Sequence, residues 1–125
     1  MNPLLLKPEL QKYLRENLNL DTATLALKGS PFDEVSASEL AQQLTGLQKS
    51  QKKLPSWFKT RGVYYPPKLN LEQTSSEETA AYKAALYKGD FLADLTGGYG
   101  VDSLAFSKSF EKVFYCERNH ALAQV

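Results

Sequence analysis

Apolar side chains recur at helical spacing near the start of the chain. Leu10, Tyr13, Leu14 and Leu18 fall on one face of a helix, with polar residues between them. A proline at the first helical position is compatible with this pattern, because its missing N–H would have no intrahelical partner there. The pattern predicts an amphipathic helix over residues 8–18.

Two further helices are predicted in the same half of the chain. Asp21 can cap a short helix that includes residues 24–27. Ser36 or Ser38 can begin a longer one, and Gly46, a poor helix former, is expected to split it. The N-terminal part of the chain is therefore predicted to be mostly helical.

The second half of the chain changes to a strand pattern. Residues 91–93 form a short apolar run typical of a buried parallel strand, and this run reaches Asp94. The glycine-rich stretch 96–100 cannot continue the strand and predicts a tight turn. A helix over residues 101–110 and a strand over residues 112–117 follow. Strand, turn, helix and strand make one βαβ unit.

Two adjacent prolines lie between these patterns. Pro66 and Pro67 favour an extended connector, so a domain boundary is predicted here. The first domain, residues 1–67, is helical and ends in a basic connector, and the second begins at residue 68 and runs to 125. The predicted fold class is α/β: a helical domain followed by the opening βαβ unit of a Rossmann-like domain.

Side-chain patterns refine the second domain. Ser75 and Glu78 have the spacing of a capping box, which would begin a helix over residues 77–87. Leu104 belongs to the inner stripe of the helix after the glycine turn. Cys116 occupies an apolar strand position and is predicted to fill the core.

Both predicted strands end at an acid. Asp94 follows the first strand, and Glu117, 17 residues after Gly100, ends the second. In nucleotide-binding folds, an acid about 20 residues beyond the glycine turn hydrogen-bonds the ribose hydroxyls. The spacing therefore indicates a nucleoside ligand.

Classes of nucleoside ligand fit this turn to different degrees. No Gly-Lys-Ser or Gly-Lys-Thr follows it, which excludes a P-loop. Gly98 and Gly100 meet half of the dinucleotide pattern Gly-x-Gly-x-x-Gly, but its third position is Ser103. The carboxylate of Asp94 would repel a pyrophosphate, whereas it suits the sulfonium and amino groups of S-adenosylmethionine. A nicotinamide or flavin site and a turn without a ligand stay open as alternatives.

The run 94–100, Asp-Leu-Thr-Gly-Gly-Tyr-Gly, resembles motif I of class I S-adenosylmethionine-dependent methyltransferases, in which an acid precedes alternate glycines. Thr96 departs from that motif, because it stands where the motif has its first glycine. With residues 53–57, 70–83 and 115–119 added, the chain is similar to a bacterial methyltransferase family. Complete members of that family carry a C-terminal THUMP-like, ferredoxin-like domain.

The resemblance implies roles for individual residues. Asp94, Gly98 and Gly100 would approach the methionine part of S-adenosylmethionine, and Glu117 would contact its ribose. The other candidate cofactor-binding residues are Thr96 and Gly97 in the loop, Arg118 or Asn119 beside the adenine, and Glu72, Gln73 and Ser75 at the start of the preceding helix. The resemblance assigns no catalytic residue.

Composition narrows the setting of the protein. With 42% hydrophobic and 23% charged residues, the 125-residue chain has an ordinary composition for a folded domain. No apolar run approaches the ~18 residues of a membrane span, and no signal-peptide pattern is present, so a cytoplasmic protein without a membrane partner is predicted. Cys116 and His120 are the only residues of their kinds, so no metal site is expected, and His120 is predicted to lie on a solvated helix surface.

Charge is unevenly distributed along a chain whose formal net charge is only +1. Between Glu39 and Glu72 there is no acidic residue but there are six basic ones: Lys49, Lys52, Lys53, Lys59, Arg61 and Lys68. The same segment contains four aromatic residues: Trp57, Phe58, Tyr64 and Tyr65. Cations with aromatic rings suit phosphate contacts and base stacking, so RNA is a predicted partner of the first five basic residues. Alternatively, the lysines form a solvated face and the aromatic residues pack an interdomain seam.

Two interpretations from different classes result. A complete domain of the methyltransferase class has about seven strands, and only two are predicted here. The first interpretation is therefore the N-terminal fragment of an enzyme that methylates RNA (tRNA or rRNA), inactive alone and able to self-associate through an unpaired strand edge. The second is a helical nucleic-acid- or protein-binding module with a vestigial nucleotide-binding fold, or a NAD-type Rossmann protein.

Overall fold

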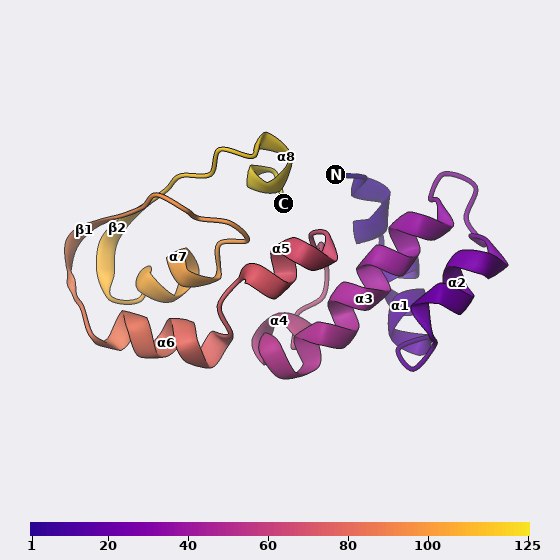
Figure 1. The fold of residues 1–125 in the computed structure, drawn as a ribbon, viewed down its shortest axis with the longest axis horizontal. Coiled ribbons are helices and arrows are strands. Elements are labelled where there is room, and N and C mark those ends of the chain that lie inside the picture. The colour runs from indigo at the N-terminus through magenta and orange to yellow at the C-terminus, as the bar shows by residue number, and fades with distance from the viewer. The chain divides into compact units, whose positions relative to one another are not determined.

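The computed structural model describes residues 1–125, which form two compact units, an N-terminal unit (1–71) and a C-terminal unit (72–125). The N-terminal unit contains η1 (Pro3–Leu6), α1 (Pro8–Glu16), α2 (Thr22–Lys28), α3 (Ala37–Lys53), α4 (Pro55–Lys59) and most of α5 (Lys68–Gln73) (Figure 1). The C-terminal unit contains α6 (Glu77–Ala85), β1 (Gly89–Asp94), α7 (Val101–Phe106), β2 (Phe110–Tyr115) and α8 (His120–Ala123). No helix is both long enough and apolar enough to cross a membrane.

Side-chain caps begin α2 and α3, as the sequence predicts. The carboxylate of Asp21 accepts the backbone N–H of Thr24 at 2.8 Å at the start of α2. Ser36 forms a full capping box with Glu39, so Ser36 and not Ser38 begins α3. Such caps satisfy backbone donors that have no intrahelical partner and contribute about 1 kcal/mol each.

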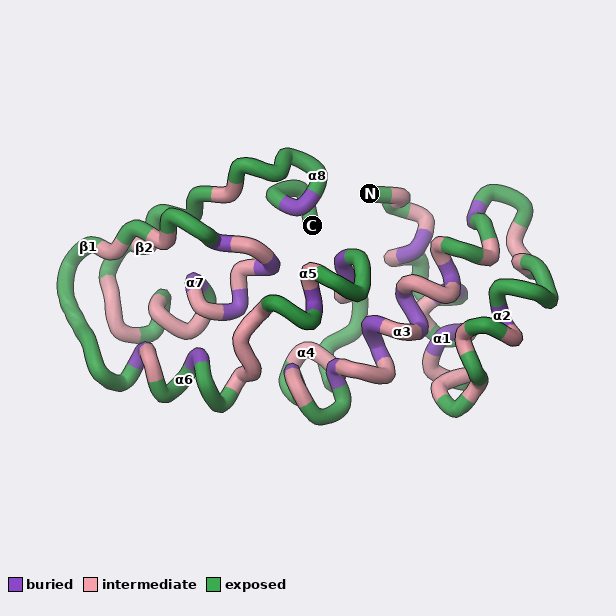
Figure 2. Tube along the Cα trace, in the orientation of Figure 1, coloured by how far each residue is buried: buried purple, intermediate pink, exposed green.

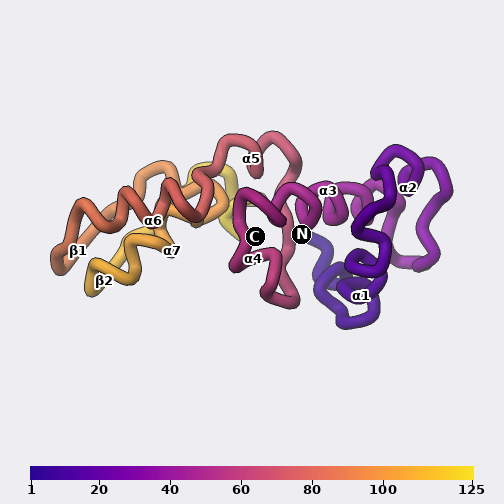
Figure 3. Tube along the Cα trace, turned by 90° about the horizontal axis from the view of Figure 1, so that it is seen from below, coloured from indigo at the N-terminus to yellow at the C-terminus, as the bar shows by residue number.

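Leucine side chains make the core of the N-terminal unit. The helices α1 and α2 lie beside the long α3 in both views (Figures 1 and 3). The buried leucines of this unit are Leu5, Leu10, Leu14, Leu25, Leu40, Leu44, Leu47, Leu54 and Leu71. Each of these side chains contributes roughly 1.5–3 kcal/mol when fully removed from water. Their burial therefore determines how α1 packs on α3.

The helix α3 continues unbroken through Gly46, so the predicted break is wrong. Gly46 is buried, and a Cβ built on it would lie 2.2 Å from the Cβ of Tyr65. One turn earlier, the Gln43 side chain donates to the Tyr65 carbonyl at 2.7 Å and accepts the Tyr65 N–H at 2.8 Å. The glycine therefore allows the chain after α4 to approach α3 closely.

In the C-terminal unit, β1 and β2 run parallel and are joined through α7, which confirms the predicted βαβ unit. Asp94 at the end of β1 lies opposite Tyr115 at the end of β2. Glu117, predicted as the last residue of the second strand, lies two residues beyond it. The helix α7 ends at Phe106 and is shorter than predicted.

The helix α6 begins at Glu77, as predicted, but Ser76 and not Ser75 is its N-cap residue. The hydroxyl of Ser76 accepts the backbone N–H of Thr79 at 3.1 Å and caps the helix. The predicted capping role of Ser75 is therefore wrong, because its hydroxyl bonds to a neighbouring helix. α6 ends at Ala85, two residues before the predicted end.

Much of the two-stranded sheet is exposed (Figure 2). Phe91 is 64% exposed and Phe114 56%, and their rings stack on each other with centroids 6.5 Å apart. Leu104 and Cys116 are exposed as well, so the predictions that placed them in the core are wrong. The physical reason is that two strands with two short helices cannot enclose both faces of a sheet.

Candidate functional site

The glycine loop connects the end of β1 to the start of α7 (Figure 1). Gly98 has φ 55° and Gly100 has φ 80°, values that residues with a Cβ rarely adopt. Gly100 is the N-cap residue of α7, and its N–H donates to the Gly97 carbonyl at 2.7 Å. The backbone conformation of the loop therefore requires glycine at both positions.

Asp94 is tied to both ends of this loop. One carboxylate oxygen accepts the backbone N–H of Thr96 at 3.1 Å, and the other accepts the Ser103 hydroxyl at 2.6 Å. Ser103 is buried in α7 and occupies the third position of the dinucleotide pattern, so the residue that breaks this pattern bonds to the strand-end acid. Each carboxylate oxygen retains a lone pair with which Asp94 could accept from a ligand.

Glu117 reaches the loop from beyond the end of β2. One of its oxygens accepts the Gly98 N–H at 2.9 Å, and the other accepts the Asn119 N–H at 2.7 Å. These bonds, that from Asn119 above all, hold the pKa of Glu117 below its ordinary value. Glu117, which is predicted to contact a ribose, is therefore an anion at neutral pH. Each of its carboxylate oxygens can accept one further hydrogen bond.

Tyr115 is a site residue that the sequence reasoning missed. Its hydroxyl donates to the Gly98 carbonyl at 2.6 Å, and its ring lies so close to Gly97 that a Cβ there would be 2.2 Å away. Burial, followed by the charges of Glu117 and Asp94, raises the pKa of Tyr115, so the hydroxyl remains a donor. The signal for it is its strand register opposite Asp94, which the sequence does not show.

A polar network places Ser75 beside the first turn of α7. Its hydroxyl donates to Asp102 at 2.8 Å and accepts from the Lys83 ammonium at 2.8 Å. The same ammonium lies 2.7 Å from the second carboxylate oxygen of Asp102. The network joins the segment before α6, α6 itself and α7, and it explains why Ser75 does not cap α6.

The other predicted cofactor residues occupy exposed positions. Thr96 is exposed and meets Asp94 only through its backbone. Asn119 caps α8, because its side chain accepts the N–H groups of Ala121 and Leu122. The remaining exposed candidates are Glu72, Gln73 and Arg118.

The predicted nucleic-acid residues all belong to the N-terminal unit. Lys52, Lys59 and Arg61 are exposed, and Lys49 and Lys53 are half-buried on α3. Among the aromatic residues of this segment, Tyr65 is buried against α3 and unavailable for base stacking; Trp57, Phe58 and Tyr64 are half-buried.

His120 is exposed at the start of α8, as predicted. No cluster of three or more His, Cys, Asp or Glu side chains that could hold a metal ion occurs in the structure.

These features define a mixed helix and strand protein in which a parallel strand pair carries a glycine loop flanked by two acids. Comparison with solved structures finds this fold in a crystal structure described as that of a "putative methyltransferase" from Porphyromonas gingivalis W83. The two chains are 28% identical with a TM-score of 0.74, and the match covers 90% of this chain and 28% of that chain. No protein-family model and no curated protein sequence match.

The chain is therefore similar in fold to a methyltransferase-type structure. The methyltransferase fold that the glycine motif indicates is therefore confirmed, whereas membership of the family with a THUMP-like domain stays a prediction. The chain spans 28% of the length of that neighbour.

Proposed function

We propose that the chain is the cofactor-binding part of an S-adenosylmethionine-dependent methyltransferase. One observation carries the proposal: two acids meet at one glycine loop, Asp94 at the end of β1 and Glu117 two residues beyond β2, where its carboxylate is bonded to Gly98. Two carboxylates favour a ligand with cationic and hydroxyl groups over one with a pyrophosphate. The similarity to the Porphyromonas protein supports the same class of enzyme.

The two acids have different proposed roles. Asp94 would accept from the amino group of the methionine part, because each of its oxygens retains an acceptor direction. Glu117 would accept from the ribose hydroxyls in the same way. S-adenosylmethionine supplies an electrophilic methyl group, and the residues of this chain bind and orient the molecule. The supporting positions proposed are Thr96, Gly97, Gly98 and Gly100 in the loop, Arg118 or Asn119 beside the adenine, and Gln73 and Ser75 before α6.

RNA, tRNA or rRNA, is the proposed substrate. Residues 1–71 contain ten basic and six acidic residues, whereas residues 72–125 contain five basic and eight acidic ones. A polyanion is therefore attracted to the N-terminal unit. Lys52, Lys59 and Arg61 are exposed and available to phosphate groups.

The proposed activity belongs to a larger protein than residues 1–125. The two-stranded sheet exposes Phe91 and Phe114, which further strands and helices of a complete domain would cover. We place the catalytic residues in those further elements and expect residues 1–125 alone to transfer no methyl group. The THUMP-like C-terminal domain belongs to the same proposal.

Calorimetry tests cofactor binding. In the complete protein, S-adenosylmethionine is expected to bind, and Glu117→Ala should weaken binding roughly 10- to 150-fold in Kd, because hydrogen bonds to a charged group are lost. Glu111→Ala is the matched control, since it removes the same charge from an exposed position of β2. Binding of NADH without binding of S-adenosylmethionine would contradict the proposal and favour a NAD-type protein.

A further inference from the structure

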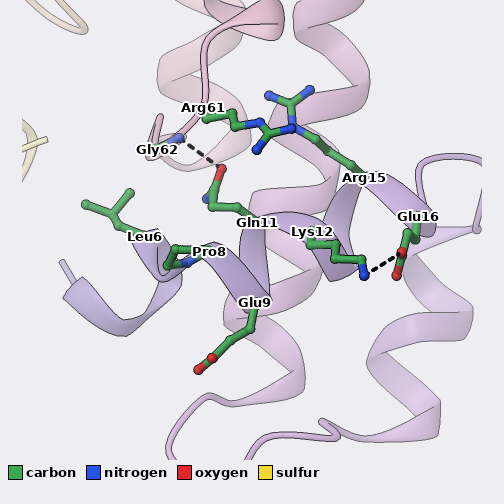
Figure 4. A pocket seen from close by; sticks show the side chains of 9 residues that line it. All are labelled: Leu6, Pro8, Glu9, Gln11, Lys12, Arg15, Glu16, Arg61 and Gly62. Carbon is green, nitrogen blue, oxygen red and sulfur yellow. Dashed lines mark hydrogen bonds and ion pairs between the residues drawn. The ribbon is translucent and has the colours of Figure 1, made fainter.

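A hollow of about 910 Å³ lies in the N-terminal unit between α1 and the chain that follows α4 (Figure 4). Leu6 and Pro8 line one end of it, and Arg15 and Arg61 line the other. All of its lining residues belong to the unit formed by residues 1–71. The cavity is therefore a property of this unit alone.

Two side chains of α1 hold the loop that carries Arg61. One terminal nitrogen of Arg15 donates to the carbonyls of Phe58 and Thr60, both at 2.9 Å. Gln11, one turn before Arg15 on the same helix, accepts the backbone N–H of Gly62 at 3.3 Å. Because the residues on both sides of Arg61 are bonded to α1, its guanidinium is carried by an anchored loop and not by a free one.

Positive charge gathers at this end of the hollow without a carboxylate to neutralise it. The carboxylate of Glu16 lies 3.7 Å from the ammonium of Lys12. Glu9 points away from the two guanidinium groups (Figure 4). Neither Arg15 nor Arg61 forms a salt bridge, and the Nε atom of Arg15 is buried without a hydrogen-bond partner. The guanidinium of Arg15, which lies 5.5 Å from the centroid of the Phe58 ring, adds positive charge to this end of the hollow, whereas Arg61 is the exposed cation there.

We propose that Arg15 and Arg61 form a binding site for a backbone phosphate of RNA. Guanidinium groups bind phosphate oxygens through paired hydrogen bonds, which makes arginine more selective for phosphate than lysine. Lys59, exposed two residues before Arg61, extends the positive surface along which a polynucleotide can continue. The site rests on the proposed RNA substrate and is independent of cofactor binding.

The test is the salt dependence of RNA binding. Fluorescence anisotropy with a labelled single-stranded RNA oligonucleotide is measured on the 125-residue chain at several KCl concentrations. Arg61→Gln should lower affinity several-fold and reduce the log–log salt slope by up to about 0.7, the value for one lost single-strand phosphate contact. Lys28→Gln is the matched control, because it removes one exposed positive charge from the same unit outside the hollow. It should leave the slope unchanged.

A second variant separates a guanidinium site from general charge attraction. Arg61→Lys keeps the charge but loses the paired donors, so affinity should fall while the salt slope is retained. Equal effects of Arg61→Gln and Lys28→Gln, or full affinity with lysine at position 61, would overturn the site. Competition by inorganic phosphate with no RNA binding would also overturn it. If the chain does not bind RNA, the proposal that RNA is the substrate is contradicted as well. Calorimetry with S-adenosylmethionine tests the cofactor proposal separately.

Discussion

Both backbone polar groups of Gly98 are hydrogen-bonded to residues at the end of β2 or just beyond it. Its carbonyl accepts the Tyr115 hydroxyl at 2.6 Å, and its N–H donates to Glu117 at 2.9 Å. A loop of glycines has more conformational freedom to lose than any other loop. These two bonds therefore set the loop conformation in advance of ligand binding, which reduces the entropy cost of binding.

The Glu117 bond predicts a pH dependence of the loop. The pKa of Glu117 lies below its ordinary value of 4.5, so its contribution to stability is present above that value and is lost as pH falls through the lowered pKa. In an NMR titration of the 125-residue chain, the Gly98 amide signal should move with a midpoint below pH 4.5. The movement should disappear in Glu117→Gln. A midpoint at or above the ordinary value would show that the carboxylate does not bind the loop.

At the scale of elements, the close approach of the chain after α4 to α3 organises the N-terminal unit. The Gln43 side chain makes two hydrogen bonds to the Tyr65 backbone, and Gly46 provides the space for the Tyr65 ring. Arg15 and Gln11 attach the chain just before this point to α1. These contacts bring α1, α3 and the basic segment together in one unit.

Gly46→Ala tests this packing. Alanine is the better helix former by about 1 kcal/mol, yet the new Cβ would lie 2.2 Å from Tyr65. Overpacking of this kind costs typically 1–3 kcal/mol, so a net loss of up to about 2 kcal/mol in the free energy of unfolding is expected. Gln51→Ala, at an exposed position of the same helix, should cost nothing measurable. Urea denaturation compares the two, and an unchanged or raised midpoint for Gly46→Ala would contradict the close packing.

At the scale of the molecule, the C-terminal unit exposes a sheet edge and an apolar face. The sheet consists of β1 and β2 only, so each strand has one unpaired edge. Phe91 and Phe114 lie exposed and stacked on one face. Unpaired edges beside apolar rings favour pairing with another chain or cover by further elements of the same protein.

The 125-residue chain should therefore self-associate through this surface. Sedimentation should show an average mass that rises with concentration, and the amides of residues 92–94 should become protected from hydrogen exchange as association proceeds. Phe91→Lys should suppress the association, because a charge on an edge strand opposes pairing. Leu27→Lys is the control, since Leu27 is 88% exposed on α2. A monomer at every concentration, or a chain with methyl-transfer activity by itself, would contradict both the free edge and the incompleteness of the site.

The sequence by itself determined the local features of this protein. Helical spacing and caps predict α1, α2 and the start of α3, because these depend on residues within a few positions of each other. The strand, glycine turn, helix and strand order predicts the βαβ unit and its two acids for the same reason.

Contacts between distant residues were decided only by the tertiary structure. Tyr65 packs on Gly46, which lies within an unbroken helix. The Ser75 hydroxyl bonds to Asp102 and does not cap α6, and the Tyr115 hydroxyl reaches Gly98 because of the strand register. The anchored Arg61 depends on a helix some 45 positions earlier in the chain. Patterns of polarity show which face of an element is apolar, but which other element meets that face depends on long-range packing.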